Sequence, residues 1–259
     1  MTRAVRVAGP DGPWGPVRSA LADRGTVVVH SSVDDWATAV PEELERLLGH
    51  EAARHRTMAP AARARFAASR LLLKHAAATA LDVRATDLEL ARSPGGRPYL
   101  RGCGTVDVSL SHTGGLVAVG LNLRGSVGVD AEPVSRTVHG TGVELRACIP
   151  RERAALERLP AHRRDLAMLR LWTLKEAYTK ALGTGLRLPF SSFGFALRPD
   201  GPPLLLRADG TRAPQDEWSF GSRVVRSGHV LGTATGRPMS FAVHSSRSGS
   251  RSGVFNSTA

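Results

Sequence analysis

The sequence predicts an α+β fold made of two similar halves with a cleft between them. A buried strand that ends in polar residues (26–35) is followed by helices and then by strands, and a second buried strand (126–132) is followed by helices and strands in the same order. The order of elements repeats without clear residue identity, as in a structural repeat. Interfaces between such halves are preferred places for small-molecule sites, so we expect the active site there.

We divide the 259 residues into an N-terminal extension (1–25), an N-terminal half (26–124), a C-terminal half (125–245) and a disordered tail (246–259). The extension is rich in Gly and Pro, which predicts a loosely held segment, and the tail is a low-complexity Ser, Gly and Arg stretch. No apolar run reaches the ~20 residues that cross a bilayer, and the start lacks the apolar segment of a secretory signal. We therefore expect a cytoplasmic protein.

Charge and cysteine content narrow the class of partner. The formal net charge is +12 and the pI is near 11.2, which favours a polyanion: nucleic acid, a phosphorylated cofactor or an acidic protein surface. Aromatic residues make up only 5% of the chain, so no platform for stacking bases is visible. Cys103 and Cys148 are too few for a zinc cluster or a disulfide framework, and we expect both to be buried thiols.

The N-terminal half begins with a short strand and continues as helices. Residues 26–30 (T-V-V-V-H) predict a buried strand, after which a helical region extends to about residue 82. Pro60 suits the first position of the last helix, because the fixed φ of proline is already helical. The residues that follow have high helix propensity, and Phe66 and Leu73 lie on one apolar side.

An irregular turn and two predicted strands complete this half. Residues 93–100 (S-P-G-G-R-P-Y-L) predict an irregular turn before a strand. Residues 106–111 alternate apolar and polar side chains, and the polar face consists of Asp107, Ser109 and Ser111. A T-G-G turn after His112 then leads into a second strand, 116–121. Because side-chain donors at a strand end can grip a phosphate, this end of the hairpin is a candidate anion site as well as an ordinary turn.

The segment S-V-G-V-D-A-E-P (126–133) predicts a strand with two carboxylates on one face. Residues two apart on a strand share a face, so Asp130 and Glu132 project together while Val129 and Ala131 face the core. Their repulsion favours a cation between them, and carboxylates combined with water and phosphate oxygens are typical magnesium ligands. Two edge carboxylates in water fit this fragment equally well.

The segment W-T-L-K-E-A-Y-T-K-A-L-G (172–183) predicts a helix with a polar stripe. Trp172, Glu176 and Lys180 are four residues apart and share one face. Lysine occurs only at positions 74, 175 and 180, so the compact ammonium groups kept here favour contact with a phosphate or proton donation. Taken alone, the stripe also fits an exposed Glu–Lys pair.

The rest of the C-terminal half is expected to be helical and then β. Residues 139–186 predict helices with breaks near Pro150 and Pro160, ending at Gly183. The strands predicted after them, separated by turns such as P-D-G and S-G-H, are 193–197, 204–207, 218–225, 229–235 and 239–244.

Four motifs together resemble those of the 4′-phosphopantetheinyl transferases of the larger, monomeric class, which activate carrier proteins of peptide and polyketide synthesis. The motifs are G-R-P (96–98), V-S-L-S-H (108–112), V-G-V-D-A-E (127–132) and W-T-L-K-E-A-Y-T-K (172–180). They stand in the family's order and at about its spacing. One departure is Ala131, where the family usually has a larger aliphatic residue, and only a small packing effect is expected.

The resemblance implies a pseudo-twofold α+β fold that binds coenzyme A in the cleft, transfers its phosphopantetheine arm to a carrier serine and releases adenosine 3′,5′-bisphosphate. The implied magnesium ligands are Asp130, Glu132 and Glu176. The implied coenzyme A contacts are Arg65, Arg97, Ser111, His112 and Lys180, with Arg65 and His112 near the 3′-phosphate and Lys180 near the diphosphate. We hypothesise that Glu176, directly or through a metal-bound water, takes the proton of the carrier serine and that Lys180 steadies the leaving phosphate.

The expected protein partners are acidic carrier domains, which a basic surface attracts over long range. The candidate docking surface is 134–150, where Val138, Val143, Leu145 and Ile149 lie beside Arg136 and Arg146. We expect a monomer with no nucleic-acid or membrane partner. Two alternatives remain: a basic nucleic-acid-binding protein, and a different magnesium-dependent enzyme such as a nucleotide phosphohydrolase.

Overall fold

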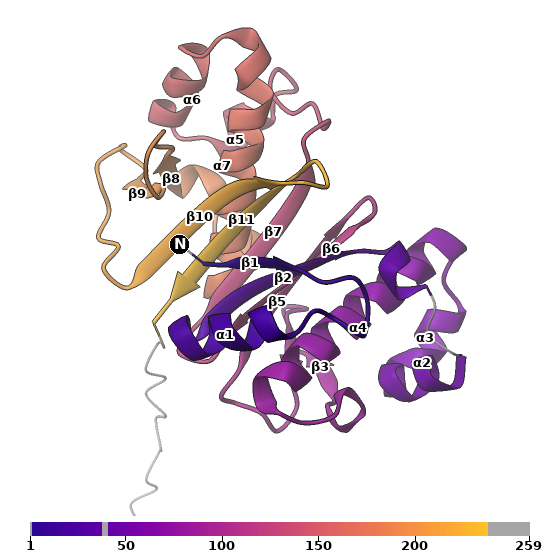
Figure 1. Ribbon diagram of the computed structural model, residues 1–259. Coiled ribbons are helices and arrows are strands. Elements are labelled where there is room, and N and C mark those ends of the chain that lie inside the picture. The colour runs from indigo at the N-terminus through magenta and orange to yellow at the C-terminus, as the bar shows by residue number, and fades with distance from the viewer. Residues whose placement is uncertain (1, 38–40, 238–259) are drawn as a thin grey trace, which may run out of the picture.

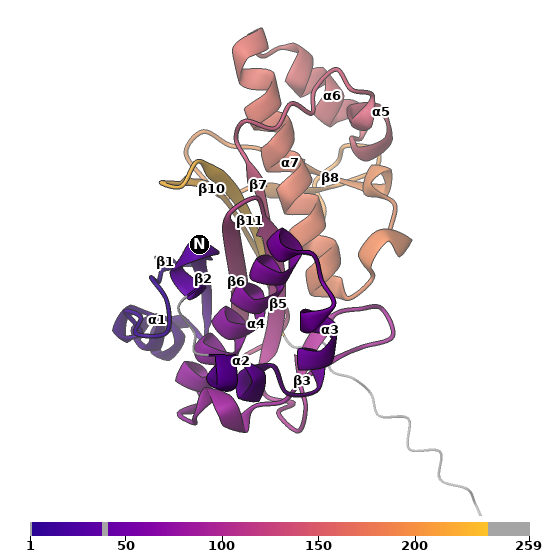
Figure 2. The same cartoon turned by 90° about the vertical axis from the view of Figure 1, so that its right-hand side faces the viewer.

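The computed structural model describes residues 2–37 and 41–237, which form two halves joined along the edges of their sheets (Figure 1). Each half packs one long helix against a sheet: α4 (Pro60–Leu81) in the N-terminal half and α7 (Ala161–Leu182) in the C-terminal half. Figure 2 shows α7 lying along β7 and α4 lying along the sheet of the other half. The α+β fold predicted from the sequence is confirmed.

The N-terminal half contains a four-stranded sheet of order β1-β2-β6-β5, in which β1 runs parallel to β2 and the other pairs are antiparallel. Its strands are β1 (Ala4–Arg6), β2 (Thr26–Ser32), β5 (Asp107–Thr113) and β6 (Leu116–Asn122), with a separate pair β3 (Leu90–Arg92) and β4 (Pro98–Leu100). Its other helices are α1 (Gly15–Arg24), α2 (Pro41–Leu48) and α3 (Ala52–Arg56). Apolar residues of α4 such as Leu72 and Ala76 pack on Val27 and Val119 of the sheet and form the core.

The C-terminal half contains a three-stranded antiparallel sheet of order β10-β11-β7. Its strands are β7 (Val127–Pro133), β10 (Trp218–Val225) and β11 (His229–Gly236), with a separate antiparallel pair β8 (Phe193–Ala196) and β9 (Leu204–Arg207). Its shorter helices are α5 (Val143–Ala147) and α6 (Pro150–Glu157). Its core joins Met168 and Leu174 of α7 to a cluster of aromatic rings around Tyr178.

The two halves share one connectivity. In each, a first strand leads to a helix of 22 residues and then to an antiparallel hairpin whose second strand pairs with the first strand. The order β2-β6-β5 therefore corresponds to β7-β11-β10. A small apolar cluster, with Val28 and Ala118 from one half and Val129, Ala131 and Leu231 from the other, closes the interface between the sheets.

Residues 1–25 were expected to be loosely held, and the structure corrects that expectation for the part it describes. β1 pairs with β2, and Val5, Val17 and Leu21 are buried in the core of the N-terminal half. Val17 and Leu21 are four apart and so face the same neighbour on α1, a signal that the surrounding Gly and Pro residues obscured. The strand predicted at 239–244 and the tail 246–259 lie outside the described residues.

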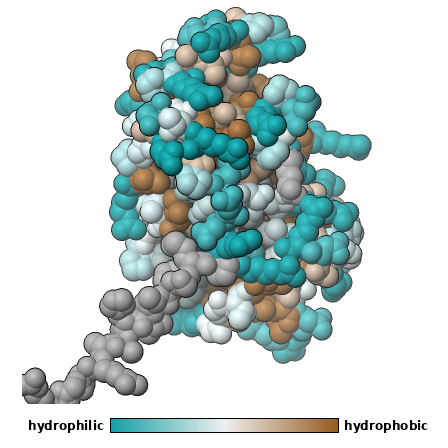
Figure 3. Space-filling view, turned by 90° about the vertical axis from the view of Figure 1, so that its left-hand side faces the viewer, coloured by the Kyte–Doolittle hydropathy of each residue, from teal (hydrophilic) through white to brown (hydrophobic). Residues whose placement is uncertain are grey.

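The face of the molecule shown in Figure 3 is mainly polar. Figure 3 shows one face on which hydrophilic side chains predominate and apolar residues gather in small separate patches. Within the described ranges, no helix combines the length and the hydropathy that crossing a bilayer requires.

Candidate active site between the halves

A pocket of about 420 Å³ lies between the two halves and receives residues from both. Its ionisable lining consists of Arg70, Arg92, Arg97 and His112 from the N-terminal half and Asp130 and Lys180 from the C-terminal half. The prediction of a cleft between similar halves is therefore matched by a pocket with a mainly cationic wall. Such a wall is suited to an anionic ligand.

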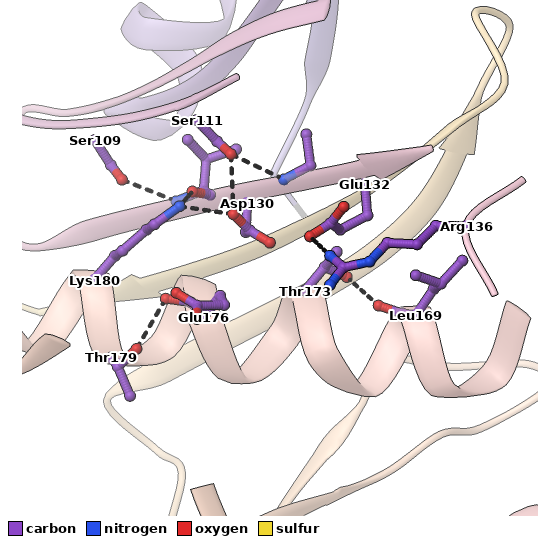
Figure 4. A network of polar contacts seen from close by, with 12 residues as sticks. Ser109, Ser111, Asp130, Glu132, Arg136, Leu169, Thr173, Glu176, Thr179 and Lys180 are labelled. Atoms are coloured by element: carbon purple, nitrogen blue, oxygen red, sulfur yellow. Dashed lines mark hydrogen bonds and ion pairs between the residues drawn. The ribbon is translucent and has the colours of Figure 1, made fainter. Parts of the chain in front are cut away.

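The carboxylates of β7 face α7, as their alternation predicts (Figure 4). Asp130 is buried, and its Oδ1 atom lies 2.7 Å from the Nζ atom of Lys180, which also donates to the Val129 carbonyl at 3.1 Å. Glu132 is ion-paired with Arg136, four residues further along the chain. The guanidinium of Arg136 lies 5.7 Å from the ring centre of Trp172, which connects the first residue of the helical stripe to this cluster.

Glu176 approaches the same two carboxylates from α7. Burial raises the pKa of Glu176, the negative charge of Asp130 raises it further, and the charge of Lys180 opposes this shift. Burial and then Asp130 likewise raise the pKa of Glu132, against the lowering effect of Arg136. The three predicted magnesium ligands are thus close enough to act on one another electrostatically, although Glu132 and Glu176 do not line the pocket itself.

Two glycines allow α7 to come this close to the sheet. A Cβ atom at Gly128 of β7 would overlap the carbonyl oxygen of Ala177, and one at Gly232 of β11 would overlap the main chain of Thr173. Helix and strands therefore touch backbone to backbone, which brings Glu176 and Lys180 to the carboxylates of β7. The sequence analysis did not give Gly128 a role, although a glycine inside a strand is a signal of close backbone approach.

The donor set fits a hard divalent cation. The Oδ2 atom of Asp130 is buried and has no hydrogen-bond partner among the described residues, and the charge of Asp130 raises the pKa of both Glu132 and Glu176 nearby. Carboxylate oxygens are the ligands that magnesium prefers. Within residues 2–37 and 41–237, no three Asp, Glu, His or Cys side chains converge as a ready-made metal cage.

Side chains of β5 bind the free backbone edge of β7 and join the two sheets; we call this contact the seam. The backbone N–H groups of alternate β7 residues donate to β5 side chains: Val127 to Asp107 at 2.7 Å, Val129 to Ser109 at 3.1 Å and Ala131 to Ser111 at 3.2 Å. The predicted alternation of β5 is confirmed, and its polar face meets the other half. Ser111 also donates to Asp130 Oδ1 at 2.9 Å.

Arg97 takes part in the seam as well. Its Nη2 atom donates to Asp107 at 2.5 Å and to the Val127 carbonyl at 2.8 Å. Its Nη1 atom is buried and has no hydrogen-bond partner among the described residues. The Nη2 atom of Arg97 therefore helps to hold the halves together, and the N–H groups of Nη1 remain able to donate to a ligand.

His112 lies at the end of β5, near several cations. Solvent reaches its side chain, but partial burial lowers the pKa of His112, and Arg65, Arg70 and Lys180 lower it further. Arg65 is half-buried and is not among the residues that line the pocket. Arg70 does line it, and the sequence analysis gave this residue no role; it is held by a two-pronged ion pair with Glu51 and lies 4.0 Å from the ring centre of Phe66.

The inference from the scarcity of lysine is wrong for Lys175. This side chain is fully buried and directs its three N–H groups to the Phe190 carbonyl at 2.7 Å, the Phe193 carbonyl at 2.5 Å and Glu152 at 2.9 Å. Three donors meet three acceptors, so the ammonium group stabilises the C-terminal half and does not reach the pocket. Lys180, one turn further, is the lysine that does.

Two further expectations need correction. In the candidate docking surface, Val138 and Ile149 are buried in the core, whereas Leu145 is 67% exposed and Val134 is 40% exposed. The remaining apolar surface is therefore much smaller than expected. Cys148 is buried as predicted, but Cys103 is partly exposed because it lies in a turn between β4 and β5.

The fold and site together define an α+β protein of duplicated connectivity with carboxylates and a lysine beside an arginine-lined pocket. The family model of the 4′-phosphopantetheinyl transferase superfamily matches residues 126–234. The match includes β7, α7 and the β10–β11 hairpin. The match confirms, over this part of the chain, the resemblance expected from the motifs.

Individual relatives give the same result. The protein slr0495 of Synechocystis sp., which carries the name of a 4′-phosphopantetheinyl transferase, is 31% identical over 150 residues, which are 57% of this chain and 61% of the relative. HetI of Nostoc sp., a 4′-phosphopantetheinyl transferase, is 30% identical over 58% of this chain and 64% of its own. A 4′-phosphopantetheinyl transferase of Bacillus subtilis is 26% identical over 54% and 61%. The matches thus span somewhat less than two thirds of each relative.

Proposed function

We propose that the protein is a 4′-phosphopantetheinyl transferase that moves the phosphopantetheine arm of coenzyme A to a serine of a carrier protein and releases adenosine 3′,5′-bisphosphate. The observation that carries the proposal is the meeting of Lys180 and Asp130, from two different elements, at the wall of a pocket lined with arginines between the halves. A nucleotide with a diphosphate and a 3′-phosphate matches that charge. The match of residues 126–234 to the family model of this superfamily supports the same proposal.

The reaction breaks a diphosphate bond, so catalysis depends on position and on neutralising charge. Magnesium held by Asp130, Glu132 and Glu176 would supply positive charge to the diphosphate oxygens. Lys180, which is bonded to Asp130, would offset the charge of the leaving phosphate. Arg65, Arg97 and His112 would orient the nucleotide from the other half.

Glu176 is our candidate base. Burial and the neighbouring carboxylates raise the pKa of Glu176, which makes its carboxylate a better proton acceptor than an exposed one. The Glu176 side chain lies on the stripe of α7 that faces the carboxylates of β7. This proton transfer would leave the serine oxygen free to attack phosphorus.

The second substrate would be an acidic carrier domain, and the enzyme would act as a monomer. The net charge of +12 supports long-range attraction of such a partner. Leu145 and Val134 provide exposed apolar contacts on the C-terminal half. Association should therefore become slower as salt is added.

The test is to incubate the protein with coenzyme A, magnesium and an apo carrier domain, and to weigh the carrier by mass spectrometry. A mass gain of one phosphopantetheine group supports the proposal. Free hydrolysis of coenzyme A without carrier modification would indicate a phosphohydrolase, and tight salt-sensitive binding of DNA with neither reaction would indicate a nucleic-acid-binding protein.

Two variants test the residues. Glu176→Gln should lower turnover by about 10²-fold or more, because it removes a base and a charge near the diphosphate. Glu157→Gln is the matched control, since the Glu157 side chain is 64% exposed and forms only surface ion pairs in the described structure. Near-normal turnover of Glu176→Gln, with carrier modification intact, would remove Glu176 from the mechanism.

A further inference from the structure

We propose that Ser111 is a positioning residue that fixes the Asp130 carboxylate, and that it is not a contact for the phosphate of the nucleotide. The inference rests on the proposed function, because it concerns how the site of that reaction is held. It replaces the direct ligand contact that the family resemblance implied for Ser111.

The Ser111 hydroxyl is buried, and both of its hydrogen-bonding functions are in use. The hydroxyl has one proton, and this proton is directed to Asp130 Oδ1 at 2.9 Å. Its oxygen accepts the backbone N–H of Ala131 at 3.2 Å. A phosphate oxygen is only an acceptor, so Ser111 cannot donate to a phosphate while it donates to Asp130.

The bond from Ser111 helps to fix the orientation of the Asp130 carboxylate. Ser111 and Lys180 both donate to Oδ1, and they leave Oδ2 buried with no partner among the described residues (Figure 4). Two donors on one oxygen select one rotation of the carboxylate. The free oxygen is then presented in a fixed direction, as a ligand for a cation must be.

Ser109 lies two residues before Ser111, on the same face of β5. Ser109 accepts the backbone N–H of Val129 at 3.1 Å, just as Ser111 accepts that of Ala131. Both serines therefore hold the seam in the same way, and only Ser111 bonds a carboxylate of the cluster. Ser109→Ala is consequently the matched control for Ser111→Ala.

The experiment compares these two variants with the wild-type chain by four measurements. Crystal structures report the rotation of the Asp130 side chain. Calorimetric titration of Mg²⁺ into protein saturated with coenzyme A reports ion affinity. Steady-state transfer to an apo carrier gives kcat and KM for coenzyme A, and thermal unfolding reports the loss of a seam bond.

Both variants should lower the melting temperature by a similar amount. Only Ser111→Ala should rotate Asp130, weaken Mg²⁺ binding and lower kcat, each by about tenfold or more, with KM for coenzyme A within about twofold of wild type. A rise in KM with unchanged ion affinity and an unmoved Asp130 would overturn the inference in favour of a ligand contact. Equal effects of the two variants in every measurement would overturn it in favour of a purely structural role.

Failure of the proposed function would look different. If the wild-type chain modifies no carrier, the function is wrong, whereas the position of Asp130 in the two variant structures still decides the role of Ser111. If the wild-type chain is active and Asp130 stays in place in Ser111→Ala, the function stands and the inference falls.

Discussion

The Nζ atom of Lys180 lies 2.7 Å from Asp130 Oδ1, so a cation from α7 neutralises the most buried carboxylate of β7. The same nitrogen donates to the Val129 carbonyl at 3.1 Å. Lys180 is thus bound to the strand itself, one helical turn beyond Glu176, and it links the C-terminal end of α7 to the pocket between the halves.

Two replacements of Lys180 distinguish the effect of its positive charge from the effect of its side-chain geometry. Lys180→Ala is expected to lower turnover by about 10²- to 10³-fold, because it removes a cation from the site where negative charge develops. Lys180→Arg keeps the charge with a different geometry and should retain more activity than Lys180→Ala. Carrier mass spectrometry measures the rates, and equal, near-normal rates for both variants would contradict the role of Lys180.

Gly128→Ala tests the backbone contact between β7 and α7. The added methyl group would overlap the Ala177 carbonyl, so the helix must move away, and we expect a loss of about 3 kcal/mol in the free energy of unfolding together with loss of transfer activity. Denaturant titration provides the measurement. Gly15→Ala is the control, because no atom lies within 4 Å of an added Cβ there. Similar stability of the two variants would show that α7 does not depend on this contact.

The buried pair of Lys175 and Glu152 should be costly to break. Glu152→Gln leaves an ammonium group in the core without its counter-charge, and we expect a destabilisation of about 3–5 kcal/mol in urea denaturation. Glu157→Gln, at an exposed surface ion pair, should cost less than about 1 kcal/mol. Comparable midpoints for the two variants would mean that the buried pair contributes little.

His30 should make stability depend on pH. Burial, and then the charges of Arg6, Arg223 and His229, lower the pKa of His30 from 6.5 to about 4. The unfolded chain therefore binds a proton that the folded chain refuses between these values, so stability falls as pH decreases from about 6.5 to about 4. The loss is about 3 kcal/mol at most.

The measurement is denaturant unfolding at several pH values for wild type and His30→Gln. Glutamine does not titrate in this range, so the variant should lose less stability than wild type on acidification. Parallel stability curves for the two proteins would show that another group is responsible.

The two cysteines should differ in reactivity. Cys103 is partly exposed, whereas burial raises the pKa of Cys148 to about 12 and leaves almost no thiolate. A maleimide reagent should therefore add once to the native protein, at Cys103, and twice after denaturation. Peptide mass mapping identifies the site, and rapid native labelling of Cys148 would contradict its burial.

Local periodicity predicted the parts of the site that lie on single elements. The alternation around Asp130, the i, i+4 spacing of Glu176 and Lys180, and the polar face of β5 were all readable, because each depends only on the geometry of its own helix or strand. The repeated order of strands and helices likewise predicted the two halves. The limits proposed at residues 124 and 125 remain a prediction.

Contacts between distant elements could not be read in the same way. The bond from Ser111 to Asp130 and the burial of Lys175 depend on which surfaces meet after folding. Lys175 lies on the same helix as Lys180, and its structural role depends on the carbonyls of Phe190 and Phe193 and on Glu152, which are distant in the sequence. The packing of α1 was missed because two apolar residues on one turn give a weak signal among glycines and prolines.

The touching main chains of α7 and β7 have a consequence for how the molecule tolerates change. Side chains can repack around a small intrusion, but two polypeptide backbones in direct contact have no compressible layer between them. A side chain added at Gly128 would therefore push α7 away from β7 and move Glu176 and Lys180 relative to the carboxylates of β7. The spacing between the residues of α7 and the carboxylates of β7 thus depends on main-chain contact more than on side-chain rotamers.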